Sequence, residues 1–199
     1  MTQLTDLYLG RNKISRIQNL DTLGHLRHLD LTDNRIRGLE NLDSLHLLQE
    51  IYLDKNKITE IKSLDNLINL RVLSLQSNRL TSMAGFSKLL HLEELYLGGN
   101  YITKISGLES CSNLRVLDIR SNHIPCLENI AHLEHLEELW ASYNKISSLE
   151  EIEVQLRDKE HLASIDFKEN PLETPGSKSL WLALPQIFSI DGATRPVDL

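Results

Sequence analysis

Aromatic and acidic residues recur at one fixed interval along this 199-residue chain, and their chemistry suits contact with another protein. At steps of 22 residues, with a last step of 26, the row reads, in order, Tyr8, Asp30, Tyr52, Ser74, Tyr96, Asp118, Trp140 and Asp166. A ring buries a large area with little loss of side-chain freedom, and carboxylates select basic partners. Glu138 stands two residues before Trp140 and adds a further acid. The row therefore predicts a protein-binding surface; the alternative is that the rings only cover the surface beneath them.

Histidine and cysteine side chains could hold a metal, but their spacing does not favour one. The pairs His25/His28 and His132/His135 are three residues apart, and neither falls in a predicted helix. Cys111 replaces an apolar core residue, so we interpret it as a buried side chain rather than a ligand. We expect no metal site, no cofactor and no small-molecule ligand.

No arrangement of nucleophile and base predicts an enzyme. Ser, His and Asp residues do not form a recognisable catalytic set, and the stretch GSKS at 176–179 lacks the spacing of a phosphate-binding loop. We therefore expect a non-enzymatic protein.

Composition narrows the class of partner. A formal net charge of -7 argues against binding to nucleic acid, which favours a basic face. Apolar runs are too short to cross a bilayer, and the start MTQLTDLYLG lacks the basic and apolar parts of a secretory signal. Two cysteines and no Asn-x-Ser/Thr site favour a reducing, intracellular compartment.

The element that positions these residues is a 22-residue repeat, LxxLxLxxNxIxxIxxLxxL. Its asparagine recurs seven times without a slip and once more after four extra residues, at Asn12, Asn34, Asn56, Asn78, Asn100, Asn122, Asn144 and Asn170. We number positions from the first leucine, so the asparagine is position 9 and the row of rings and acids is position 5. The alternation L-x-L predicts a short strand, and stacked copies predict a parallel sheet. The asparagine is expected to bond the backbone of its own and the next repeat.

The second half of each repeat is apolar at every third residue, as at Ile14, Ile17, Leu20 and Leu23. A period of three fits 3₁₀-like turns better than an α-helix. A strand and a short return limb together predict an α/β-class, right-handed solenoid with the sheet on its concave side.

Three regions follow from this reading. Residues 1–147 hold seven repeats, 148–172 hold a helical insertion and the eighth repeat, and 173–199 form a C-terminal cap. In the insertion, Leu149, Ile152 and Leu156 suit one face of a helix, with Arg157 and Lys159 at its end. In the cap, the residues expected to close the core are Trp181, Leu182, Leu184, Ile187, Phe188 and Ile190. The first strand starts near Leu4 without a cap, so we expect an open N-terminal edge. Either upstream repeats are missing, which we favour, or another chain covers this edge.

Longer stretches resemble one family more closely than the repeat alone requires. These are LRVLSLQSNRLTSMAGFSKLLHLEELYLGGN, LRVLDIRSNHIPCLENIAHLEHLEELWASYNKI and the ending NPLE…LALPQIFSIDGA. They resemble the leucine-rich-repeat regulatory subunits of type-1 Ser/Thr protein phosphatase, over essentially the whole chain. Asp166 departs from the aromatic residue of that family, and TPGSKSLW lacks its tyrosine and paired arginines.

The resemblance implies a regulatory subunit that binds the phosphatase catalytic subunit along its concave face. The residues carried over are Tyr8, Asp30, Tyr52, Asp118, Glu138 and Trp140. It also implies location in the nucleus and cytoplasm, and we expect a monomer when the chain is alone. The alternative is a leucine-rich-repeat scaffold of another complex, of the spliceosomal or axonemal type.

Overall fold

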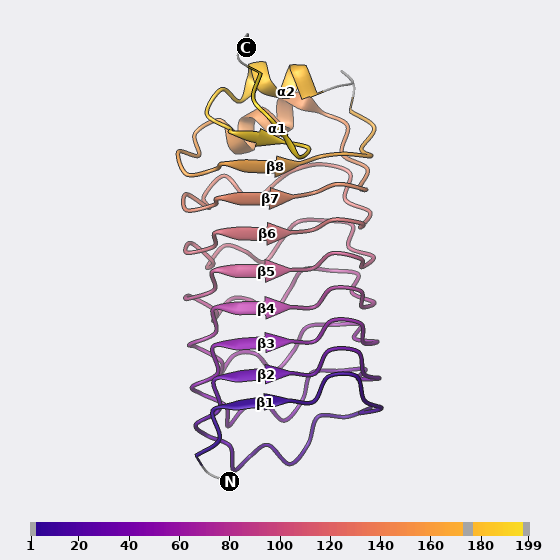
Figure 1. Ribbon diagram of the computed structural model, residues 1–199, viewed down its shortest axis with the longest axis vertical. Helices are drawn as coiled ribbons and strands as arrows, with labels where there is room; N and C mark the ends of the chain where they lie inside the picture. The colour runs from indigo at the N-terminus through magenta and orange to yellow at the C-terminus, as the bar shows by residue number, and fades with distance from the viewer. Residues whose placement is uncertain (1–2, 173–176, 197–199) are drawn as a thin grey trace.

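The computed structural model describes residues 3–172 and 177–196 as one curved solenoid (Figure 1). Its strands are Asp6–Tyr8 (β1), His28–Asp30 (β2), Glu50–Tyr52 (β3), Val72–Ser74 (β4), Glu94–Tyr96 (β5), Val116–Asp118 (β6), Glu138–Trp140 (β7), Ser164–Asp166 (β8), Ser189–Ile190 (β9) and Ala193–Thr194 (β10). The helices are Leu149–Leu156 (α1) and Ser177–Ala183 (α2).

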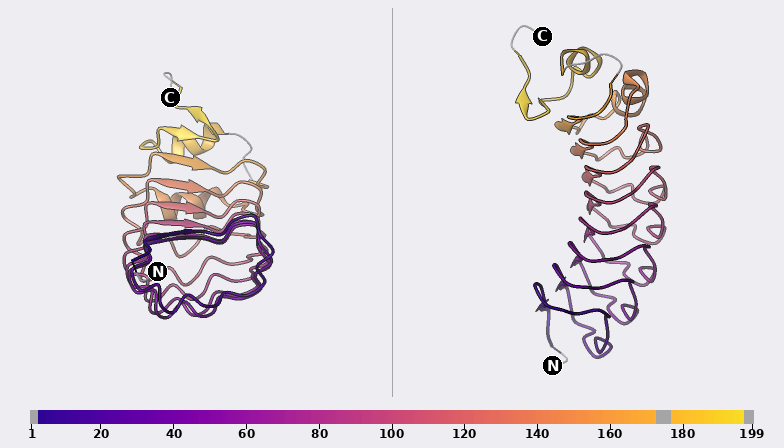
Figure 2. Two further views of the ribbon diagram at one scale, coloured as in Figure 1. Left: turned by 60° about the horizontal axis from the view of Figure 1, so that its bottom comes forward. Right: turned by 90° about the vertical axis from the view of Figure 1, so that its right-hand side faces the viewer.

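The ten strands form a single sheet in sequence order, parallel from β1 to β9 and antiparallel only between β9 and β10. From β1 to β7 each residue pairs with the residue 22 positions further on, as Tyr8 does with Asp30. The side view in Figure 2 shows the strands on the inner side of the arc. The predicted parallel, concave sheet is therefore confirmed.

A continuous apolar core fills the space behind the sheet. The middle residue of each strand from β2 to β8 points into it, and Leu29, Leu73 and Leu117 are fully buried. At the N-terminal end, Leu4 and Leu7 pack against this core but are only partly buried. Stacking thus buries in each repeat what one repeat could not bury alone.

The described return limbs contain the predicted 3₁₀-like turns but no continuous 3₁₀ helix. Successive backbone hydrogen bonds do link residues three apart, such as Leu23 N to Leu20 O and Leu26 N to Leu23 O, each 2.9 Å. The residue before each such pair of turns has a positive φ in six repeats, at Asn19, Asn41, Ser63, Gly85, Gly107 and Asn129. A left-handed residue cannot continue a right-handed helix. The limb therefore consists of separate turns, and no 3₁₀ helix forms in the described residues.

Helix α1 lies where the seventh repeat is four residues longer than the others. Ser148 caps it by accepting a hydrogen bond from Glu151 N at 3.1 Å, and Ile152 and Leu156 are buried beneath it. The expectation is confirmed for Arg157, which is the C-cap of α1 and donates its backbone N–H to Glu153 O. It is wrong for Lys159, which takes an apolar core position at the end of the seventh repeat instead.

Lys159 is buried because its ammonium replaces missing backbone partners. It donates to the carbonyl oxygens of Ile130 and Leu133, both at 2.8 Å, and to that of Ala131 at 3.2 Å. Gln155, four residues earlier, accepts hydrogen bonds from the amides of Ile130 and Ala131. Burial lowers the pKa of Lys159 to about 8. These two side chains join the insertion to the return limb of the sixth repeat.

The described part of the cap closes the C-terminal edge of the core. Trp181, Leu184, Ile187 and Ile190 are buried there, and β9 extends the sheet beside β8. The expectation is wrong for Leu182 and Phe188, which are 63% and 66% exposed. Helix α2 has only one side against the core, and Leu182 lies on the other. Residues 173–176 and 197–199 of the predicted cap lie outside the described residues.

Asparagine side chains connect consecutive repeats. Asn100, 4% exposed, donates to the carbonyls of Leu97 in its own repeat and Leu75 in the preceding one, at 2.9 and 3.0 Å. Its oxygen accepts from Leu80 N, again in the preceding repeat, at 3.0 Å. The other repeats from the second to the eighth share this pattern, so the bond expected to the next repeat runs to the preceding one.

We predict that Asn100→Ala lowers the free energy of unfolding by about 3 kcal/mol, since it leaves several buried backbone groups without partners. Chemical denaturation followed by circular dichroism measures this loss.

Asn12→Ala is the matched control, because Asn12 is exposed and bonds only Leu9 O and Gly10 O of its own repeat. We expect it to cost less than about 1 kcal/mol. Equal losses in the two variants would contradict a role in connecting repeats.

Candidate protein-binding surface

The side chains at positions 3 and 5 of the repeats point away from the core, and together they line the inner side of the arc. We call this the concave surface. Strand residues alternate in burial, as Glu94, Leu95 and Tyr96 do, with the middle one buried and the outer two half-buried. Because the register is uniform, each position forms a row that crosses the strands.

Three rings gather at the N-terminal end of the concave surface. The His28 ring lies between Tyr8 and Tyr52, with centroids 4.8 and 5.3 Å away. Glu50 joins them, since its Oε2 lies 3.0 Å from His28 Nδ1 and accepts a hydrogen bond from Tyr52 OH at 3.1 Å. We call Tyr8, His28, Glu50 and Tyr52 the N-terminal cluster.

Tyr96 and Trp140 form a second group of rings, with centroids 6.2 Å apart. The Tyr96 hydroxyl donates to Glu94 at 2.7 Å, and Glu138 lies half-buried on the strand of Trp140. Both rings keep part of their surface open to solvent. We call Tyr96, Trp140 and Glu94 the C-terminal cluster.

Strand β4 separates the two clusters, because it carries no ring. Ser74 is only 2% exposed, and its hydroxyl bonds Asp54 of the preceding repeat. Asp54 also accepts from Gln76 N at 2.7 Å. The expectation that Ser74 faces a partner is wrong, because its side chain is enclosed.

The aspartates of the row accept hydrogen bonds from backbone amides two residues further along the chain. Asp30 accepts from Thr32 N at 2.8 Å, and Asp118 and Asp166 do the same for the amide two residues on, at 3.0 and 3.2 Å. Short acidic side chains favour this turn. Asp30 and Asp166 stay half-buried at the surface, whereas Asp118 is fully buried. The prediction that Asp118 itself faces the groove is wrong.

Asp118 instead holds Arg120. The carboxylate accepts from Arg120 Nε at 3.0 Å and from Nη2 at 2.8 Å, which raises the pKa of the guanidinium. Gly98 on the preceding repeat makes room, since a Cβ there would lie 3.2 Å from both carboxylate oxygens. The guanidinium carbon lies 4.7 Å from the centroid of the Trp140 ring. Cation–π contact thus covers part of Trp140.

Several residues of this surface were not assigned from sequence. His28, Glu50 and Glu94 occupy position 3, where the alternation of the strand already predicts an outward side chain. Position 3 carries many residue types along the chain, so no repeated chemistry identified these three as site residues. Arg120 occupies position 7, beyond the strand, and only the fold shows that it turns back over Trp140.

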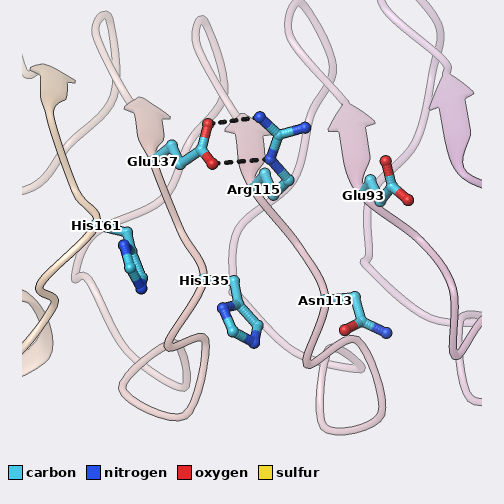
Figure 3. A pocket seen from close by; sticks show the side chains of 6 residues that line it. All are labelled: Glu93, Asn113, Arg115, His135, Glu137 and His161. Atoms are coloured by element: carbon cyan, nitrogen blue, oxygen red, sulfur yellow. Dashed lines mark hydrogen bonds and ion pairs between the residues drawn. The ribbon is translucent and has the colours of Figure 1, made fainter.

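A polar pocket lies beside the concave surface, on the loops that lead into the strands (Figure 3). His135 and His161 stack there with centroids 6.0 Å apart, and Arg115 pairs with Glu137 at 2.8 and 2.9 Å. Glu93 is paired with Arg71 at 3.0 Å. The charged side chains of this pocket are therefore largely paired with one another or with neighbours in the same chain.

Within the described part of the chain, no three His, Cys, Asp or Glu side chains meet in a way that could hold a metal ion. Neither helix in residues 3–172 and 177–196 has the length and apolar character to cross a bilayer. Cys111 is a buried free thiol, and burial raises its pKa to about 11.

A curved parallel sheet that presents rings and carboxylates along its inner side defines a solenoid scaffold for protein–protein interaction. The chain belongs to the leucine-rich repeat family. The profile for "Leucine Rich repeats (2 copies)" matches residues 2–44, 24–66, 46–91, 68–110, 90–135 and 112–154. A search of curated protein sequences returned no significant match.

Solved structures share the fold. An internalin of Listeria monocytogenes, 23% identical, aligns over 98% of this chain and 62% of its own with a TM-score of 0.77. A second internalin of that organism, internalin C2, is 27% identical over 94% of this chain and 79% of its own, with a TM-score of 0.83. A chain in the Toll–Spätzle complex of Drosophila is 28% identical and aligns over 85% of this chain and 26% of its own, with a TM-score of 0.75. The chain spans less than two thirds of the first internalin.

We predict that Tyr52 ionises at about pH 12 in the folded chain, because burial and then the Glu50 carboxylate raise its pKa from 10.0. A folded pKa above the unfolded one means that this group stabilises the fold below pH 10 and loses its contribution as the pH rises to about 12. The tyrosinate absorbance lost in Tyr52→Phe measures the midpoint.

Glu50→Gln is the companion variant. It removes the neighbouring charge but leaves the burial, so the Tyr52 midpoint should fall part of the way towards 10.0. A midpoint that Glu50→Gln leaves unchanged would show that the two side chains do not interact.

Proposed function

We propose that this protein is a non-enzymatic regulatory subunit that binds the catalytic subunit of type-1 Ser/Thr protein phosphatase through its concave surface. The observation that carries the proposal is the pair of half-exposed rings Tyr96 and Trp140, with Glu94 and Glu138 on the same two strands. Aromatic rings are typical of the central contacts of protein interfaces, and carboxylates around them select the partner by charge.

The resemblance of the whole chain to regulatory subunits of this phosphatase supplies the identity of the partner. Of the residues that it implies, Tyr8, Asp30, Tyr52, Glu138 and Trp140 keep surface open to the groove. Tyr8 is the most open, at 64% exposed, and stands at the first strand. Asp118 contributes through Arg120 and not by direct contact. We propose action in the nucleus and cytoplasm, as that family implies.

Charge supports a partner with a basic face. The N-terminal half of the concave surface holds Asp6, Asp30, Glu50 and Asp54 near its rings. Complementary charge speeds association and excludes wrong partners more than it adds affinity. Binding should accordingly weaken as ionic strength rises.

We predict that Trp140→Ala weakens binding of the purified phosphatase catalytic subunit by about 2 kcal/mol or more, because a central ring is lost from the contact. Isothermal titration of wild type and variant measures the change, with circular dichroism to show that the variant is folded.

Tyr101→Ala is the control. Tyr101 is 53% exposed but lies after the asparagine of its repeat, outside the concave surface, so its loss should leave the affinity unchanged. A folded Trp140→Ala chain with wild-type affinity would overturn the proposed site. If a pull-down recovered spliceosomal or dynein subunits and no phosphatase, the chain would instead be a scaffold of another complex.

A further inference from the structure

We infer that the C-terminal end of the concave surface binds a carboxylate side chain of the partner protein, with Arg120 as its ligand and Asp118 as a positioning residue. The inference deepens the proposed function and rests on it for the identity of the partner. It opposes the expectation, drawn from the acidic row, that the whole surface selects basic groups.

A pocket is present at this end of the surface. Its lining combines the cations Arg120 and Lys168 and the Trp140 ring with the carboxylates of Asp166 and Asp191, and so extends from the sixth repeat to the cap. The cations Arg120 and Lys168 both occupy position 7 of their repeats, two repeats apart. Trp140 is on β7, between the two repeats that carry these cations, and Arg120 partly covers its ring.

The acids around this pocket already have partners. Asp118 is fully buried and bonds the guanidinium through both oxygens. Asp166 accepts from Lys168 N at 3.2 Å, and Asp191 accepts from Phe167 N at 2.8 Å. Burial raises the pKa of Asp191 above its usual value.

The donors, in contrast, remain partly unused. A guanidinium has five N–H donors in a fixed plane, and Asp118 occupies two of them. The Arg120 side chain is 41% exposed and lines the pocket. Lys168 is exposed on the far side. A planar edge of paired donors matches a carboxylate in both geometry and charge.

Asp118 acts through Arg120, because it has no surface of its own to offer. Two hydrogen bonds from Arg120 and one from its backbone amide hold the guanidinium in one orientation over Trp140. The N-terminal cluster has no such cation, since its acid Glu50 bonds a histidine and a tyrosine instead. The two ends of the surface therefore select opposite charges and fix the direction in which a partner lies.

The first test needs no phosphatase. Nuclear magnetic resonance of the ¹⁵N-labelled chain follows the two indole N–H signals, assigned with Trp140→Phe, while a short blocked glutamate peptide is added at constant ionic strength. We expect a saturable shift of the Trp140 signal. Trp181 is buried and should not respond. A lysine peptide of equal length is the matched probe and should leave Trp140 unchanged.

Variants then assign the ligand. Arg120→Gln should abolish the shift, whereas Lys62→Gln, the same loss of charge at a side chain on the return limb, should not. Asp118→Asn should reduce the shift in the wild-type background but add nothing to Arg120→Gln. A lysine peptide that shifts Trp140 as strongly, or a glutamate response that survives Arg120→Gln, would overturn the inference. A wild-type shift that Asp118→Asn leaves unchanged would show that Asp118 does not position Arg120.

The second test uses the phosphatase catalytic subunit. We expect Arg120→Gln to weaken its binding about tenfold while Lys62→Gln leaves it unchanged. If Trp140→Ala weakens binding but Arg120→Gln leaves it equal or tighter, this inference fails and the proposed function stands. If the wild-type chain does not bind the phosphatase, yet the glutamate peptide acts through Arg120, the proposed function fails and the carboxylate site stands.

Discussion

The asparagine at position 9 is the interaction on which the rest of this structure depends. A strand that turns back on itself leaves carbonyl and amide groups inside the molecule, where water cannot reach them. Asn100 and its equivalents satisfy those groups in two repeats at once, so each repeat is tied to the one before it. The same bonds persist across the longer seventh repeat, so they fix the register of the sheet whatever the length of the return limb.

Uniform register turns a periodic sequence into rows of side chains. Parallel strands lie about 4.8 Å apart, so a residue type that recurs on alternate strands can place its rings close enough to touch. Tyr96 and Trp140 meet in this way across the strand of Asp118, whose carboxylate stays low against the backbone. Alternation of rings with short acids is thus a packing solution as well as a source of charge.

The same constraint explains how the solenoid absorbs its one irregularity. The four-residue insertion shifts the pairing of β7 with β8 to Glu138 opposite Ser164, and α1 occupies the extra length. The insertion would leave backbone groups of residues 130–133 without partners. Gln155 and Lys159 supply them, at the cost of burying an ammonium.

The sequence by itself determined the repeat, the parallel sheet, the concave row and the core, because hydrophobic period and the asparagine act over a few residues and repeat eight times. The tertiary structure alone decided which row members remain accessible. Ser74 and Asp118 carry suitable chemistry at outward positions, yet bonds to Asp54 and Arg120 enclose them. Burial likewise differs from expectation at two further residues, since Leu182 is exposed and Lys159 is buried. Such outcomes depend on partners from neighbouring repeats, which a single repeat does not specify.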